Sequence, residues 1–215
     1  MYHSYLTLYV NKAMSKKLVI FLLFASFFLN HSIYCQVKKF SFSDKTTMQI
    51  QGTSTLHDWT CNVTKVEGSI EIDSKILNKG IWSENSRIKS LKVSVPVESI
   101  KSPRGAAMEK KLYNALKSDK FPTILFTLSN IKNAAASPGP GKLDANGTLL
   151  IAGVEKPISL MVKASFSADK NLVFEGSYTL NMKDFDVEPP SAMFGQIVSG
   201  EKVTISFNAQ INKSL

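Results

Sequence analysis

A two-residue alternation of apolar and polar side chains runs through most of the chain and constrains its fold more than any other feature. In residues 202–211, for example, apolar side chains at the odd positions alternate with polar ones at the even positions. Neighbouring residues of a β-strand point to opposite faces of a sheet, so this period predicts strands with one apolar face. The same pattern occurs in segments 66–73, 91–98, 124–129, 158–167 and 172–182, and more weakly in 46–51, 54–60 and 147–152.

Turn-forming residues separate these predicted strands. They lie at residues 78–80, Asn146-Gly147, residues 168–171 and Ser199-Gly200. Many short strands joined by such turns are typical of an antiparallel sandwich or barrel. Closure into a barrel also removes the exposed edges that a long sheet would present. We therefore predict an all-β fold.

One segment has a helical period instead. Met108, Leu112 and Leu116 recur at helical spacing. Pro103 is a suitable start for a helix and Phe121-Pro122 a suitable stop. The sequence therefore predicts one short helix at about 103–118, which either covers an end of the barrel or packs outside it.

The first 35 residues have the layout of a secretory signal peptide. Lys16 and Lys17 precede an apolar run at 18–29, and a short polar stretch follows that ends at Cys35. The apolar run is shorter than the roughly 20 residues that span a bilayer, which argues against a membrane anchor. We expect cleavage after Cys35, a single domain at 36–215, and a periplasmic or secreted protein. Lipidation of Cys35 is a lesser alternative, because the bulky Tyr34 precedes it.

The charge of the chain argues against nucleic-acid binding. Removing residues 1–35 takes away three lysines and no acidic residue, so the formal net charge falls from +9 to +6. The remaining lysines are scattered, without an arginine-rich block or a basic helical stripe. A transient contact with an anionic membrane surface stays open.

The expected mature chain contains few residues for catalysis or metal binding. His57 and Cys61 are its only histidine and cysteine. Two such ligands do not make a structural zinc site, and along a strand they would stand roughly 13 Å apart, too far for a nucleophilic pair. A hydrolase using His57 with Asp58 is disfavoured because adjacent strand residues point apart. We expect no catalytic and no metal site; an intermolecular bridge through Cys61, and hence a dimer, stays open.

Four segments in order resemble the YceI-like family of periplasmic polyisoprenoid-binding proteins. They are GTSTLHDW at 52–59, VEGSIEI at 66–72, LKSDKFPTILF at 116–126 and GTLLIAGVEKPISL at 147–160. With the closing strands, the resemblance covers nearly all of residues 38–211. The chain departs from the family pattern at 134–140 and at the acidic, proline-rich segment 184–190.

The resemblance implies an eight-stranded antiparallel lipocalin-like barrel with an elongated apolar cavity. The cavity would hold a polyisoprenoid, a quinone-like lipid or another long-chain amphiphile, for transport or storage. The inward faces of the predicted strands carry no charge and mix large with small side chains, which by itself allows either a channel or a filled core. A structural or interaction barrel without a ligand is the alternative function. The candidate lining or mouth residues are His57, Trp59, Val93, Val95, Phe126, Leu160, Val162, Phe174, Tyr178 and Phe207.

Overall fold

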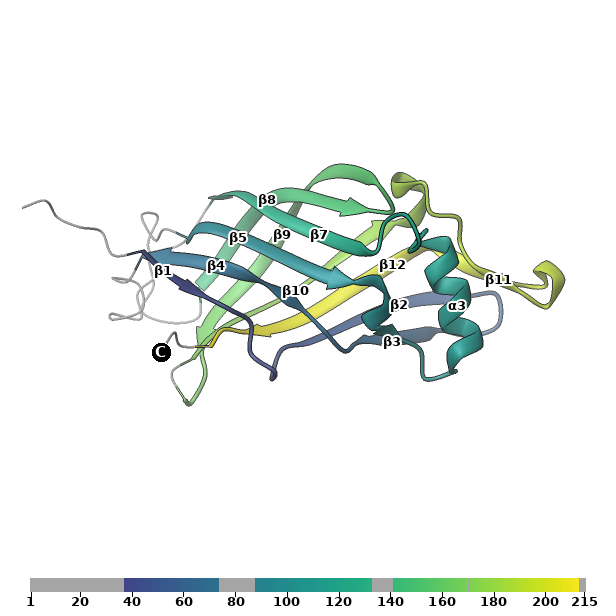
Figure 1. The fold of residues 1–215 in the computed structure, drawn as a ribbon, viewed down its shortest axis with the longest axis horizontal. Helices are drawn as coiled ribbons and strands as arrows, with labels where there is room; N and C mark the ends of the chain where they lie inside the picture. The colour runs from purple at the N-terminus through teal and green to yellow at the C-terminus, as the bar shows by residue number, and fades with distance from the viewer. Residues whose placement is uncertain (1–36, 74–87, 133–140, 170, 213–215) are drawn as a thin grey trace, which may run out of the picture. The chain divides into compact units, whose positions relative to one another are not determined.

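The computed structural model describes residues 37–73, 88–132, 141–169 and 171–212 (Figure 1). The contacts within the chain divide it between Cys35 and Gln36, and all described residues belong to the second unit. None of the helices in these ranges is long and apolar enough to span a bilayer. The turn predicted at 78–80 and the loop predicted at 134–140 lie outside the described residues.

Twelve strands are present in the described ranges, and every pairing between them is antiparallel. The strands are β1 (Val37–Phe40), β2 (Thr47–Ser54), β3 (Trp59–Val63), β4 (Glu67–Asp73), β5 (Ile88–Pro96), β6 (Ile100–Lys101), β7 (Thr123–Lys132), β8 (Gly141–Ile151), β9 (Val154–Phe166), β10 (Leu172–Asn181), β11 (Ser191–Ala192) and β12 (Ile197–Gln210).

Six of these strands are halves of three longer, bent strands. β1 pairs with β4 while β2 pairs with β3, so the segment from β1 to β2 runs alongside the segment from β3 to β4. β5 continues through the 3-10 turn η1 (Val97–Ser99) into β6, and these two pair with β4 and β3. Joining the halves and leaving out the two-residue β11 gives eight strands, as predicted.

The ladder of backbone pairings closes on itself. From β5 it passes through β7, β8, β9 and β10 to β12, and from β12 through β2 and β3 to β6, which continues β5. An isolated bridge between Phe42 and Ile211 adds a contact between the first long strand and the last. This arrangement confirms the predicted antiparallel lipocalin-like barrel. Closure leaves few unpaired strand edges, although one stretch of the wall is an exception described below.

Hydrogen bonds from side chains replace the ladder where the long strands bend. The hydroxyl of Thr64 donates to the carbonyl of Ser99 at 2.9 Å. The Ser99 hydroxyl, which is buried, lies 2.7 Å from the carbonyl of Pro96 and 3.1 Å from that of Lys65. A buried carbonyl without a partner costs free energy, so these bonds allow the bend between β5 and β6 to lie inside the wall.

Two of the turns predicted from the sequence are wrong. Asn146-Gly147 lies within β8, where a Cβ on Gly147 would stand 2.6 Å from the ring of Phe126 and 2.4 Å from a backbone oxygen. The glycine therefore permits a close approach between strands rather than a turn. The hairpin from β8 to β9 turns instead at Ala152-Gly153, where both residues have the positive φ that a tight hairpin requires. Ser199-Gly200 lies in β12, beside an irregularity in its pairing with β2.

The predicted helix is present but shorter than expected. It is α3 (Ala106–Ala115), at the end of the barrel away from β1 (Figure 1). Gly105 precedes it with a φ of 84°, and Lys117, with a φ of 54°, follows its C-terminal end. No residue of α3 is fully buried. Two further 3-10 turns occur, η2 (Met182–Phe185) after β10 and η3 (Met193–Gly195) before β12.

Candidate ligand-binding cavity

An apolar cavity of about 160 Å³ lies inside the barrel. Strands β2, β5, β7, β8, β9, β10 and β12 contribute side chains, mostly from alternate positions along each strand, as the two-residue period requires. Every described side chain in the lining is aliphatic, aromatic or a thioether, and among these residues only Tyr178 carries a polar group. None of the described residues in the lining is charged. Such a surface offers a ligand dispersion contacts and release from water, and almost no hydrogen bonds.

A second apolar cavity of about 80 Å³ lies next to α3. Leu112 and Ala115 of α3, and Leu116 directly after it, form part of its wall, so α3 closes this end of the barrel. Ile124 and Ile205 line both cavities and stand between them. The interior is therefore neither a solid core nor one continuous channel. A chain too long for the larger cavity would have to displace these two isoleucines.

The predicted lining residues fall into three groups. Trp59 lines the smaller cavity, and His57 lines neither cavity. The other eight line the larger cavity: Val93, Val95, Phe126, Leu160, Val162, Phe174, Tyr178 and Phe207. Whether any of them contacts a ligand stays a prediction.

His57 lies away from the cavities because its segment is a turn rather than a strand. The Ser54 hydroxyl accepts a hydrogen bond from the backbone N–H of His57 at 3.2 Å and donates to its carbonyl at 2.7 Å. This local turn ends β2 at Ser54, so the strand predicted over 54–60 begins only at Trp59. The imidazole Nδ1 stands 2.9 Å from the backbone carbonyl oxygen of Asp58 and therefore donates to it.

Trp59 and Gly52 close the same turn by close packing. The indole N–H of Trp59 donates to the carbonyl of Thr53 at 2.8 Å. A Cβ on Gly52 would lie 2.3 Å from the indole ring, so only glycine leaves room for it. Trp59 therefore has a structural role as well as a place in the wall of the smaller cavity.

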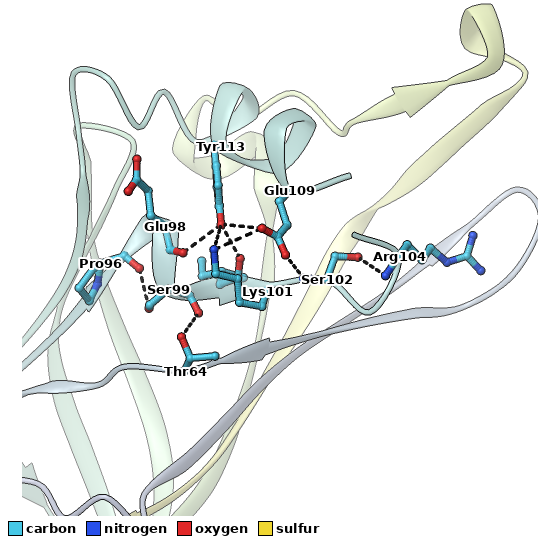
Figure 2. Close-up of polar contacts among 10 residues, drawn as sticks. Thr64, Pro96, Glu98, Ser99, Lys101, Ser102, Arg104, Glu109 and Tyr113 are labelled. Carbon is cyan, nitrogen blue, oxygen red and sulfur yellow. Dashed lines mark hydrogen bonds and ion pairs between the residues drawn. The ribbon is translucent and has the colours of Figure 1, made fainter. Parts of the chain in front are cut away.

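A polar network holds α3 against the barrel (Figure 2). The Lys101 ammonium lies 3.2 Å from the carboxylate of Glu109 and 3.0 Å from the Tyr113 hydroxyl. That hydroxyl has one proton and three acceptors within reach, the carbonyls of Glu98 and Ile100 and the Glu109 carboxylate. The backbone N–H of Ser102 donates to the other oxygen of Glu109 at 3.2 Å.

The network shifts the titration of its two charged groups. Partial desolvation would raise the pKa of Glu109, but hydrogen bonds from Lys101 and from the Ser102 backbone outweigh it and hold the pKa below its ordinary 4.5. Hydrogen bonds to Tyr113 and Glu109 raise the pKa of Lys101 above 10.5. Both groups are therefore charged throughout the neutral range, and the ion pair persists there.

The burial of Cys61 argues against the disulfide that the sequence left open. Its side chain is free and only 4% exposed, and burial raises the pKa of its thiol. Disulfide formation needs an accessible thiolate, so a bridge to a second chain is disfavoured. No group of three or more His, Cys, Asp and Glu side chains suited to a metal ion occurs within the described ranges.

Two charged residues that the sequence reading missed lie beside the cavity. Lys156 and Asp184 line an open recess of about 310 Å³ on the barrel wall, together with Tyr178 and Ile158, which also line the larger cavity. Lys156 has the same parity as Ile158 and Leu160 and so shares their face of β9. The predicted inward face began at Ile158, and continuing its two-residue period toward the N-terminus reaches Lys156. Asp184 belongs to η2 and begins the acidic segment 184–190, but no strand period places it beside the cavity.

A closed antiparallel barrel of eight long strands around an apolar cavity defines a lipocalin-like class of fold. Within it, the chain belongs to the YceI-like family, because the model of the YceI-like domain matches residues 33–211. No curated protein matches the sequence.

Solved structures share the fold at low sequence identity. BcnA of Burkholderia cenocepacia aligns with a TM-score of 0.60 at 15% identity, covering 79% of this chain and 97% of its own. A polyisoprenoid-binding domain from Saccharophagus degradans, implicated in plant cell wall breakdown, aligns with a TM-score of 0.62 at 10% identity, covering 83% and 100%. The Campylobacter jejuni YCEI protein aligns with a TM-score of 0.53 at 18% identity, covering 72% and 85%.

Proposed function

We propose that this protein binds a polyisoprenoid or another long-chain amphiphilic lipid inside the barrel, without catalysis. The observation that carries the proposal is the larger cavity, whose lining holds no charged residue and a single hydroxyl. Membership of the YceI-like family and the likeness to a polyisoprenoid-binding domain support the same class of ligand. A quinone-like lipid has the same long apolar tail and belongs to the same proposal.

The apolar tail provides most of the binding free energy in this proposal. Burying each CH₂ contributes roughly 0.8 kcal/mol, less the cost of ordering the chain and the side chains around it. A cavity of about 160 Å³ is close in size to engineered cavities of about 150 Å³ that bind benzene. A longer tail therefore requires movement of Ile124 and Ile205, so that the two cavities join.

We also propose that the protein acts outside the cytoplasm, in transport or storage of the lipid. The support is the order of charged, apolar and polar segments in residues 1–35, which are removed from the mature chain in this proposal. A barrel that shields an apolar tail from water suits an aqueous compartment between membranes.

The direct test is native mass spectrometry of the protein isolated gently from its own cells. The expected result is a retained hydrophobic molecule, identified by organic extraction. Ala145→Leu, which adds a larger side chain to the cavity wall, should lower the retained amount. Ser177→Leu, the same side chain on an exposed position of β10, is the matched control and should retain the molecule. Only unliganded protein from the unaltered chain would instead favour the interaction barrel.

A further inference from the structure

The barrel wall is incomplete between β9 and β10. Their pairing runs from Leu172↔Phe166 to Gly176↔Val162 and stops there. Beyond that point, residues 154–161 of β9 remain paired only with β8, and residues 177–181 of β10 only with β12. The wall therefore has a window in which no ladder joins the two strands. The unpaired backbone groups along it are available to water or to a ligand.

Side chains, rather than backbone pairing, fill this window. Tyr178 and Ile158 line the larger cavity on one side and the outer recess on the other. Phe185 of η2, only 3% exposed, lines the recess and the smaller cavity. Burial, and then the charge of Asp184, which lines the same recess, raise the pKa of Tyr178. One phenol ring thus separates the apolar interior from a polar surface site.

The recess contains one positive and one negative side chain. Neither Lys156 nor Asp184 forms an ion pair or hydrogen bond with another residue in the described part of the chain. Other polar groups in the recess are already engaged: the Asn181 amide donates to Glu201, and the Thr179 hydroxyl bonds to Thr204. The side-chain groups left for a ligand are therefore an ammonium, a carboxylate and the Tyr178 hydroxyl, with no net charge.

We propose that this window is the headgroup site of the barrel's ligand, with the tail in the larger cavity and the polar end in the recess. The inference rests on the proposed lipid binding and adds the chemistry of the headgroup. Because the charges of Lys156 and Asp184 cancel, the site fits a neutral headgroup better than a phosphate. A hydroxyl both donates and accepts, so it pairs with Asp184 as donor and with Tyr178 or Lys156 as acceptor.

Isothermal titration calorimetry with three probes tests this headgroup site. The probes are farnesol, its methyl ether, which cannot donate, and farnesyl phosphate, each titrated into delipidated protein. Farnesol should bind about three- to tenfold more tightly than the ether, the range expected for one hydrogen bond.

Asp184→Ala should remove that preference. Tyr178→Phe should weaken both ligands by a similar factor, since the hydroxyl donates to either oxygen. Tyr113→Phe, which alters a tyrosine hydroxyl in the α3 network, is the control and should change neither value.

The outcomes separate the headgroup site from the proposed function. Equal binding of farnesol and its ether, or a preference that survives Asp184→Ala, overturns the headgroup site while lipid binding stands. Tighter binding of farnesyl phosphate than of farnesol also overturns the proposed headgroup site, because the site would then prefer an anionic headgroup. Binding of none of the three probes overturns both proposals.

Discussion

Replacing Ile205 with alanine is expected to remove one of the two side chains between the cavities and so to ease the passage of an extended tail, with Ile124 still in place. Ile205 lines both cavities and lies in β12, whose backbone is paired on both sides by β10 and β2. The wall should therefore hold its shape when the side chain is shortened. The variant tests whether the cavities are two segments of one site for an extended tail.

The cost of this substitution follows from the position of Ile205. Three carbon groups are removed, each contributing about 0.8 kcal/mol when buried, and a cavity term is added. Because one side of Ile205 already faces the cavity, shortening its side chain removes few packing contacts. We expect a loss of about 2–3 kcal/mol in the free energy of unfolding, near the low end for such changes. Urea denaturation measures it.

The functional result is a shift in the preferred tail length. Binding of prenyl alcohols of increasing length should favour longer tails in Ile205→Ala than in the unaltered chain. Ile70→Ala is the control, because Ile70 is fully buried and lines neither cavity. It should lower stability without changing the length preference. An unchanged preference in Ile205→Ala, in a variant that folds, would refute the idea of one interrupted channel.

Three further predictions concern other parts of the molecule. Packing of α3 against the barrel should weaken in acid, because the pKa of Glu109 is lowered in the folded protein. The stability that the Glu109 carboxylate contributes is fully present above its ordinary pKa of 4.5, and it is lost as the pH falls through the lowered pKa. Hydrogen exchange of α3 amides should show this loss, and Glu109→Gln should abolish the pH dependence; the same dependence in both would contradict it. Gly147→Ala should cost about 1–3 kcal/mol, because its Cβ would overlap a backbone oxygen at 2.4 Å. An unchanged thermal midpoint would argue against that overlap. Intact-mass analysis of the exported protein should show a chain that begins at Gln36, and a chain that keeps Cys35, with or without a lipid, would contradict cleavage after Cys35.

The alternation of side chains was sufficient to predict most of the barrel and its inner face. Residues such as Phe126, Leu160 and Phe207 could be placed because a two-residue period fixes which side of a strand faces inward. The number of long strands followed from the family resemblance. The breaks within them did not, because they depend on distant partners such as Thr64 and Ser99, which bond across 35 residues.

The differences from the predicted turns and strands have both tertiary and local causes. Asn146-Gly147 has the composition of a hairpin turn, yet the glycine is needed to admit the Phe126 ring from β7. The segment of His57 was predicted as a strand beside the barrel rim, but a local hydrogen bond to the Ser54 hydroxyl folds it into a turn; a role of His57 in ligand binding stays a prediction. The window beside Tyr178 arises from where one ladder ends, and no local pattern encodes that.

Lipid binding inside the barrel is best tested by a crystal structure of the protein with a bound prenyl alcohol. Continuous density for the tail is expected between Phe126, Phe174 and Phe207, inside the closed wall and in contact with Ile205. Protein side chains collapsed into that space, with the alcohol absent or bound only on the outer surface, would contradict it.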